Sequence, residues 1–145
     1  MKTSMLRGGM AALAFAALLA GGLPASAETI NLKVAPLSGA NEVPPVTSAG
    51  TGTVTATYDT DSKKLSWKGT ISGLSGPPTA AHFHGPAAPT ANAGVVVPIG
   101  SPGASFEGSA NLTDAQAADL LAGRWYVNVH TAANPAGEIR GQVTR

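Results

Sequence analysis

The sequence predicts an all-β protein, an antiparallel β-sandwich or Greek-key barrel of about eight strands with one short helix. Short segments alternate between apolar and polar residues, turn residues separate these segments, and long helical patterns are scarce. Gly and Pro, which number 18 and 11 in 145 residues, fall largely between the alternating segments. The length is that of one domain with one modest core.

The clearest element is a hairpin formed by residues 52–59 and 64–74, because both segments alternate cleanly around the turn "TDSK". Residues 30–34 precede this hairpin as a first strand. The Pro44–Pro45 pair between them lacks two ladder donors and predicts a loop or an edge segment. The hairpin residues expected to face the core are Val54, Ala56 and Tyr58, then Leu65, Trp67 and Ile71.

The second half of the chain predicts five further strands and the helix. Thr113 is a suitable N-cap for a helix over 114–121, and Gly123 stands where that helix would end. The expected strands cover residues 80–84, 95–99, 105–112, 124–131 and 137–144. Their expected core residues are Phe83, Trp125, Val127, Val129, Ile139 and Val143.

Residues 1–27 have the pattern of a secretory signal peptide. Lys2 and Arg7 precede a short apolar run, and small residues at Ala25 and Ala27 fit a cleavage site after Ala27. The run is shorter than the roughly 20 apolar residues of a spanning helix. We therefore expect an exported protein, periplasmic or secreted, without stable membrane insertion after cleavage. A retained anchor is the alternative.

The charge balance argues against nucleic acid as a partner. Without Lys2 and Arg7, seven of the nine basic residues remain against eight acidic ones, so residues 28–145 carry a charge near −1. The chain contains no cysteine. This excludes disulfides, thiolate metal sites and cysteine nucleophiles.

The three histidines are arranged for metal binding. Alternate residues of a strand share one face, so His82 and His84 lie opposite Phe83, and His130 lies opposite Val129. If the three strands concerned are neighbours, one outward polar face gathers the histidines with Asn128, Glu138, Arg140 and Gln142. Neutral imidazole nitrogens bind copper and zinc. The sequence thus predicts a surface histidine cluster that holds copper or another transition metal.

A purely structural interpretation stays open at this point. The imidazoles can instead hydrogen-bond Thr131, Asn128 or backbone groups. Glu138 and Arg140 are expected to form an ion pair rather than to act in catalysis. We assign no catalytic residues, because the chain shows no Ser-His-Asp order, phosphate loop or close carboxylate pair.

Four motifs in order resemble the CHRD domain, named for chordin. They are "GANEVPPV", "AHFHGPA", "WYVNVHT" and "NPAGEIRGQ", and the resemblance runs from about Leu37 to Val143. In animals the domain occurs in chordin, an extracellular antagonist of bone morphogenetic proteins. In bacteria it occurs in short exported proteins. With residues 1–27 taken as a signal peptide, the resemblance implies a CHRD domain over 28–145.

A weaker resemblance is to copper-zinc superoxide dismutase, through "AHFH", "VNVH" and "NPAGEIR". It implies a sandwich fold, with His82, His84 and His130 as copper ligands and Arg140 near the active-site arginine. The dismutase's bridging histidine, zinc ligands and disulfide have no counterparts. The resemblance therefore does not by itself imply dismutase activity.

Three functions follow as hypotheses. The first is a non-enzymatic binding module that takes a metal or an unidentified protein partner on its polar face. The second is a copper-dependent oxidoreductase. The third is a structural envelope protein. Metal bound to the purified protein would distinguish the first two hypotheses from the third. Catalytic turnover would identify the enzyme.

Overall fold

The computed structural model of the chain describes residues 26–145 and confirms the all-β class. Of the expected signal peptide, residues 1–25 lie outside the described residues. No helix within residues 26–145 is long and apolar enough to cross a membrane. The strands are β1 (Thr29–Val34), β2 (Leu37–Ser38), β3 (Thr51–Asp59), β4 (Lys64–Ser72), β5 (Pro78–His84), β6 (Val95–Gly100), β7 (Ser105–Asn111), β8 (Trp125–Thr131) and β9 (Ile139–Thr144). A 3-10 helix, η1, covers Gly39–Asn41, and α1 covers Asp114–Leu121.

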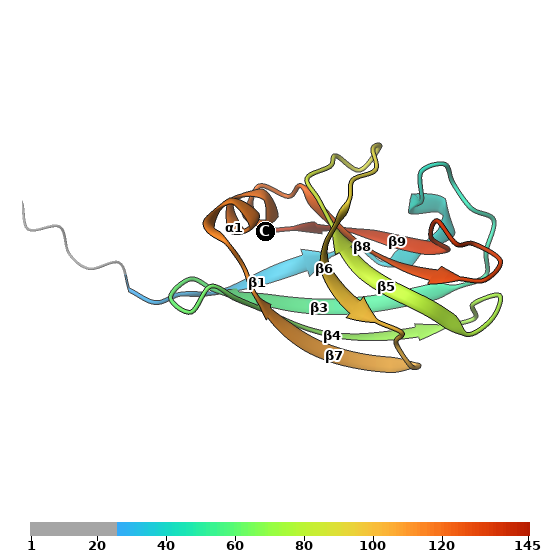
Figure 1. The fold of residues 1–145 in the computed structure, drawn as a ribbon, viewed down its shortest axis with the longest axis horizontal. Helices are drawn as coiled ribbons and strands as arrows, with labels where there is room; N and C mark the ends of the chain where they lie inside the picture. Colours follow the sequence, from blue (N-terminus) through green and yellow to red (C-terminus); the bar gives the residue numbers. More distant parts are fainter. Residues whose placement is uncertain (1–25) are drawn as a thin grey trace, which may run out of the picture.

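All strand pairs in the described residues are antiparallel and belong to one sheet, in the order β6-β5-β8-β9-β1-β3-β4-β7. The short strand β2, which the sequence analysis missed, pairs with both β3 and β9. The sheet folds over into two layers, with β6, β5, β8 and β9 above β1, β3, β4 and β7 (Figure 1). Trp67 of β4 and Phe83 of β5 meet between the layers, with ring centroids 5.2 Å apart.

The alternation of apolar and polar residues along the strands determines which side chains are buried in this core. In the β3–β4 hairpin, Ala56 pairs with Trp67 and Tyr58 pairs with Leu65, and all four side chains are buried. The turn between the strands is closed by Asp59, whose carboxylate accepts hydrogen bonds from the backbone N–H and the hydroxyl of Ser62. All six core residues expected in this hairpin, and all six expected in the later strands, are buried.

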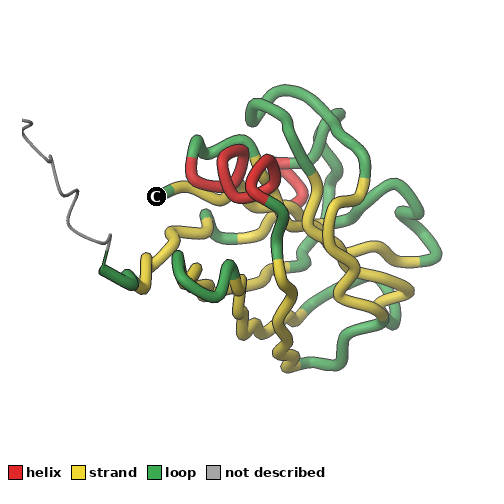
Figure 2. Tube along the Cα trace, turned by 60° about the vertical axis from the view of Figure 1, so that its left-hand side comes forward, coloured by secondary structure: helices red, strands yellow, loops and turns green. Residues whose placement is uncertain are grey.

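The helix α1 forms where the sequence predicts it. Thr113 and Gln116 make a reciprocal capping box, in which each side chain bonds the other residue's backbone N–H. Gly123, with φ of 74°, follows the helix in the left-handed region that glycine tolerates best. Ala117 and Leu120 pack into the core at the end of the sandwich where the chain terminates (Figures 1 and 2).

A buried carboxylate ties two separate loops to the end of β8. Glu138 is fully buried, and it accepts hydrogen bonds from the Ser48 hydroxyl, from the Ser75 hydroxyl and backbone N–H, and from the Thr131 hydroxyl. Burial alone would raise the pKa of Glu138, but these hydrogen bonds outweigh it and lower the pKa to about 2. The expected ion pair between Glu138 and Arg140 is wrong, because hydroxyl and amide donors, rather than the guanidinium, surround this carboxylate.

We expect Trp125→Ala to destabilise the protein by about 3–5 kcal/mol, because the indole is fully buried in the core and its loss leaves a cavity. Chemical denaturation followed by the fluorescence of Trp67 measures the change. Val95→Ala is the matched control, because Val95 is 53% exposed and its truncation should cost little. A loss below 1 kcal/mol in Trp125→Ala would show that this side chain does not support the core.

The stability of the protein should fall in acid through Glu138. Its folded-state pKa lies below its unfolded-state value of about 4.5, so its contribution is complete above pH 4.5 and is lost as the pH falls toward 2. A shift of this size corresponds to about 3 kcal/mol. In Glu138→Gln this part of the pH dependence should disappear from denaturation curves. Glu107→Gln, at an exposed side chain, should leave it unchanged.

Candidate metal centre

The fold brings the three histidines together, as the sequence predicts. His82 and His84 lie on β5, and the neighbouring strand β8 carries His130. In the register of these strands His130 pairs with Ala80, and His82 pairs with Asn128. One nitrogen atom from each imidazole lies within 4.8 Å of the other two. The three side chains can therefore reach one ion.

Backbone carbonyls fix the orientation of two of the rings. Nδ1 of His84 lies 3.0 Å from the Ala93 carbonyl oxygen, and Nδ1 of His130 lies 2.9 Å from that of Pro135. Because a carbonyl oxygen only accepts, each Nδ1 carries its hydrogen and each Nε2 keeps a free lone pair. Metal-binding histidines are commonly oriented by such a bond from the second ring nitrogen.

The third ring closes the cluster. Nδ1 of His82 lies 3.0 Å from Nε2 of His130. Since His130 Nε2 is an acceptor, His82 Nδ1 donates to it in the metal-free protein. A change of tautomer moves that hydrogen to His82 Nε2 and leaves three lone pairs facing one another. The expected hydrogen bonds to backbone groups are thus present, but they engage only one nitrogen of His84 and of His130.

Burial favours the neutral, metal-binding form of His82 and His84. His84 and His130 are buried, and His82 is partly exposed. Burial lowers the pKa of His82, and the nearby His130 and His84 lower it further. Burial is also the main cause of the lowered pKa of His84.

The polar face is not at the surface, which corrects the sequence-based expectation. Asn128, Arg140 and Glu42 are at most 5% exposed, because the segment after β2 and the segment 85–94 cover this side of the layer. The Asn92 side chain donates to the Val43 carbonyl at 2.7 Å and joins the two covering segments. Strand alternation placed Asn128 and Arg140 on the correct face, but it carries no information about loops that fold over that face.

Arg140 supports the residues that surround the histidine cluster. Its guanidinium donates to the Ala88 and Ala91 carbonyls and to the Asn92 side chain, all within the segment that supplies the Ala93 carbonyl to His84. It also lies 3.5 Å from the ring centroid of Tyr126. Tyr126 in turn stacks on His84 with ring centroids 4.8 Å apart and planes at 2°. This stack holds the His84 ring from one side.

Of the four predicted supporting residues, Asn128 alone pairs with a histidine across the β5–β8 register. Glu138 instead accepts the hydroxyl hydrogen bonds described above. Arg140 contacts the cluster indirectly, through Tyr126 and the segment 85–94. Gln142 donates to the Ala87 and Gly123 carbonyls.

Sequence reasoning missed several supporting groups. The Ala93 and Pro135 carbonyls have no side-chain signal that could have revealed them. Glu42 was also missed as a site group, although it stands in a recognised motif. It is 5% exposed beside Asn128, and burial raises its pKa to about 7.

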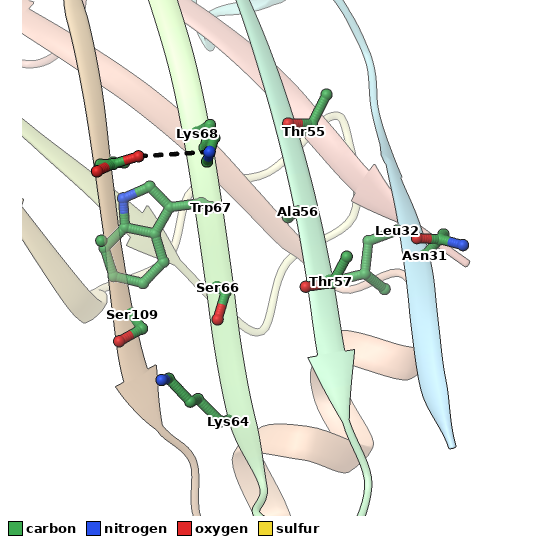
Figure 3. Close-up of a pocket in the computed structure, with 12 residues that line it drawn as sticks. Asn31, Leu32, Thr55, Ala56, Thr57, Lys64, Ser66, Trp67, Lys68 and Ser109 are labelled. Atoms are coloured by element: carbon green, nitrogen blue, oxygen red, sulfur yellow. Dashed lines mark ion pairs between the residues drawn. The ribbon is translucent and has the colours of Figure 1, made fainter.

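A hollow on the described residues lies elsewhere and does not serve this site. It measures about 600 Å³ and lies on the outer side of the other layer, over β3, β4 and β7 (Figure 3). Its lining side chains include Thr55, Thr57 and Ser66, and an exposed ion pair joins Lys68 to Glu107 at 3.6 Å. It shares no residue with the histidine cluster.

The donor set suits a transition metal. Three neutral imidazoles are typical ligands of Zn²⁺ and copper, which bind them at about 2 Å. The clustered nitrogens lie close enough for small side-chain adjustments to bring them onto one ion. The arrangement can therefore hold a metal with three protein nitrogens.

Comparison with known proteins agrees with the motifs. The CHRD domain family matches residues 33–143, which is most of the chain. No curated protein and no solved structure matches the chain. The similarity to copper-zinc superoxide dismutase thus rests on sequence motifs alone. With its histidine-bearing strands and their covering segments inside the matched region, the chain belongs to the CHRD domain family.

Proposed function

We propose that this protein is an exported, non-enzymatic CHRD-domain module that binds a transition-metal ion through His82, His84 and His130. One observation carries the proposal, namely the convergence of three imidazole nitrogens within 4.8 Å of one another in a largely buried site. Hydrogen bonds to the Ala93 and Pro135 carbonyls leave Nε2 of His84 and of His130 as acceptors. A cluster with only a structural role would not leave His84 Nε2 buried without a hydrogen-bond partner.

The ligand types favour copper or zinc. Imidazole nitrogen suits Zn²⁺ and Cu²⁺, whereas Cu⁺ is selected by thiolate and thioether ligands. The chain has no cysteine, and its three methionines all precede residue 11. We therefore expect Cu²⁺ or Zn²⁺, with one metal ion per chain.

Replacing His82, His84 or His130 by Gln should each weaken Zn²⁺ and Cu²⁺ binding by more than about 100-fold, beyond the 10–100-fold typical of an outer partner. Two remaining nitrogens hold the ion poorly. Isothermal titration of the purified, metal-stripped protein measures the affinities. Lys63→Ala is the control, because Lys63 pairs with Asp114 away from the cluster. Unchanged affinity in all three histidine variants would show that these side chains are not the ligands.

Export should leave a protein that begins at Glu28. The pattern of residues 1–27 supports cleavage after Ala27. Intact-mass analysis of the protein recovered from the periplasm or the medium measures the N-terminus. A product that keeps residues 1–27 and stays with the membrane would contradict export by cleavage.

A further inference from the structure

A second polar atom without a partner lies in the wall of the histidine cluster. Among the residues that the structure describes, both His84 Nε2 and Asn128 Oδ1 are buried and have no hydrogen-bond partner. Asn128 is 2% exposed, pairs directly with His82 across the strands, and lies two residues from His130 on the same face of β8. Its side chain therefore lies on the same face of the paired strands as the three histidines.

The amide of Asn128 is oriented by its nitrogen. Nδ2 lies 3.4 Å from Glu42 Oε1 and 3.5 Å from the Ala136 carbonyl oxygen, so the donor end faces two acceptors. Gly137 makes room for that end, because a Cβ there would lie 2.5 Å from Asn128 Nδ2. Because Nδ2 faces these two acceptors, Oδ1 at the other end of the amide points away from them.

The two unpartnered atoms, His84 Nε2 and Asn128 Oδ1, belong to one face of the paired strands β5 and β8, since Asn128 pairs with His82, two residues before His84. Because His84 Nδ1–H is engaged by the Ala93 carbonyl, its Nε2 is an acceptor, as is Asn128 Oδ1. Two buried acceptors without partners are costly unless a donor or a cation satisfies both.

We propose that Asn128 Oδ1 is the fourth ligand of the ion that His82, His84 and His130 hold, so that the site is an N₃O centre. This inference rests on the proposed metal-binding function and extends it by one ligand. The ion satisfies His84 Nε2 and Asn128 Oδ1 together. An oxygen ligand beside three imidazoles also favours Zn²⁺ or Cu²⁺ over Cu⁺.

The proposal gives different roles to the oxygen and the nitrogen of the Asn128 amide, so substitutions can test the two roles separately. Asn128→Ala removes both the oxygen and the Nδ2 donor. Asn128→Asp keeps an oxygen in place but removes the donor to Glu42 and Ala136. A ligand role predicts that Asp retains binding and Ala does not, whereas a structural role through Nδ2 predicts that both variants lose binding equally.

The experiment titrates the purified protein and its variants with Co²⁺, whose visible absorption reports coordination geometry, and with Zn²⁺ by calorimetry. Asn128→Ala should bind Zn²⁺ about 10–100-fold more weakly and change the Co²⁺ spectrum. Asn128→Asp should bind at least as tightly as the original protein and keep a spectrum of the same type. Thermal denaturation of the metal-free forms checks folding, and Asn128→Val replaces Ala if that variant does not fold. Asn31→Ala, at an exposed position of β1, is the matched amide control.

The possible results distinguish a failure of the Asn128 assignment from a failure of the proposed metal-binding function. If the unaltered protein binds neither Co²⁺ nor Zn²⁺ nor Cu²⁺, the metal site itself is wrong, and the fourth ligand with it. If it binds and loses binding in His130→Gln, but Asn128→Ala keeps its affinity and its spectrum, only the assignment of Asn128 is overturned. Equal loss in Asn128→Ala and Asn128→Asp likewise overturns the ligand role.

Discussion

The constraint on which the structure depends is that β8 is buried on both of its faces. All seven residues of Trp125–Thr131 are buried, although the segment alternates between apolar and polar side chains. One face enters the core, and the other is covered by loops. Because buried polar groups must find partners, every polar side chain on the second face has to be satisfied by those loops or by something bound.

The loops meet this requirement mostly with backbone groups. Pro135 and Ala93 accept from the ring nitrogens of His130 and His84, and Ala136 and Glu42 lie against the amide nitrogen of Asn128. The buried atoms of this face without a partner are then informative, because His84 Nε2, Asn128 Oδ1 and Gln142 Oε1 are all acceptors. A site with an excess of acceptors is complementary to a cation.

The same burial acts in opposite directions on two carboxyl groups. Glu138 is surrounded by donors from Ser48, Ser75 and Thr131, and its pKa is lowered to about 2. Glu42 has few donors, so burial dominates and raises its pKa to about 7. Glu138 thus fastens loops as an anion, while Glu42 is poised between its charged and neutral forms near neutral pH. The difference arises from the number of donors each carboxylate receives.

The sequence by itself determined the sheet and the identity of the cluster. The period of two along the strands assigned Phe83 and Val129 to the core, and the same period assigned His82, His84 and His130 to one common face. Motif and composition were sufficient here, because a side chain's face follows from its position along its own strand. The helix over 114–121 could likewise be predicted from local sequence, because its capping residues lie in or next to the helix.

The tertiary structure alone decided what covers the polar face and which of its members act together. Pairing of β5 with β8 set Asn128 against His82, and the covering segments buried Arg140, which strand alternation had placed at the surface. The tertiary structure also gave Glu138 hydroxyl donors from the remote residues Ser48 and Ser75 in place of an ion pair with Arg140. These outcomes depend on contacts between residues distant in the chain, and on backbone carbonyls that every residue type carries, so no local pattern encodes them.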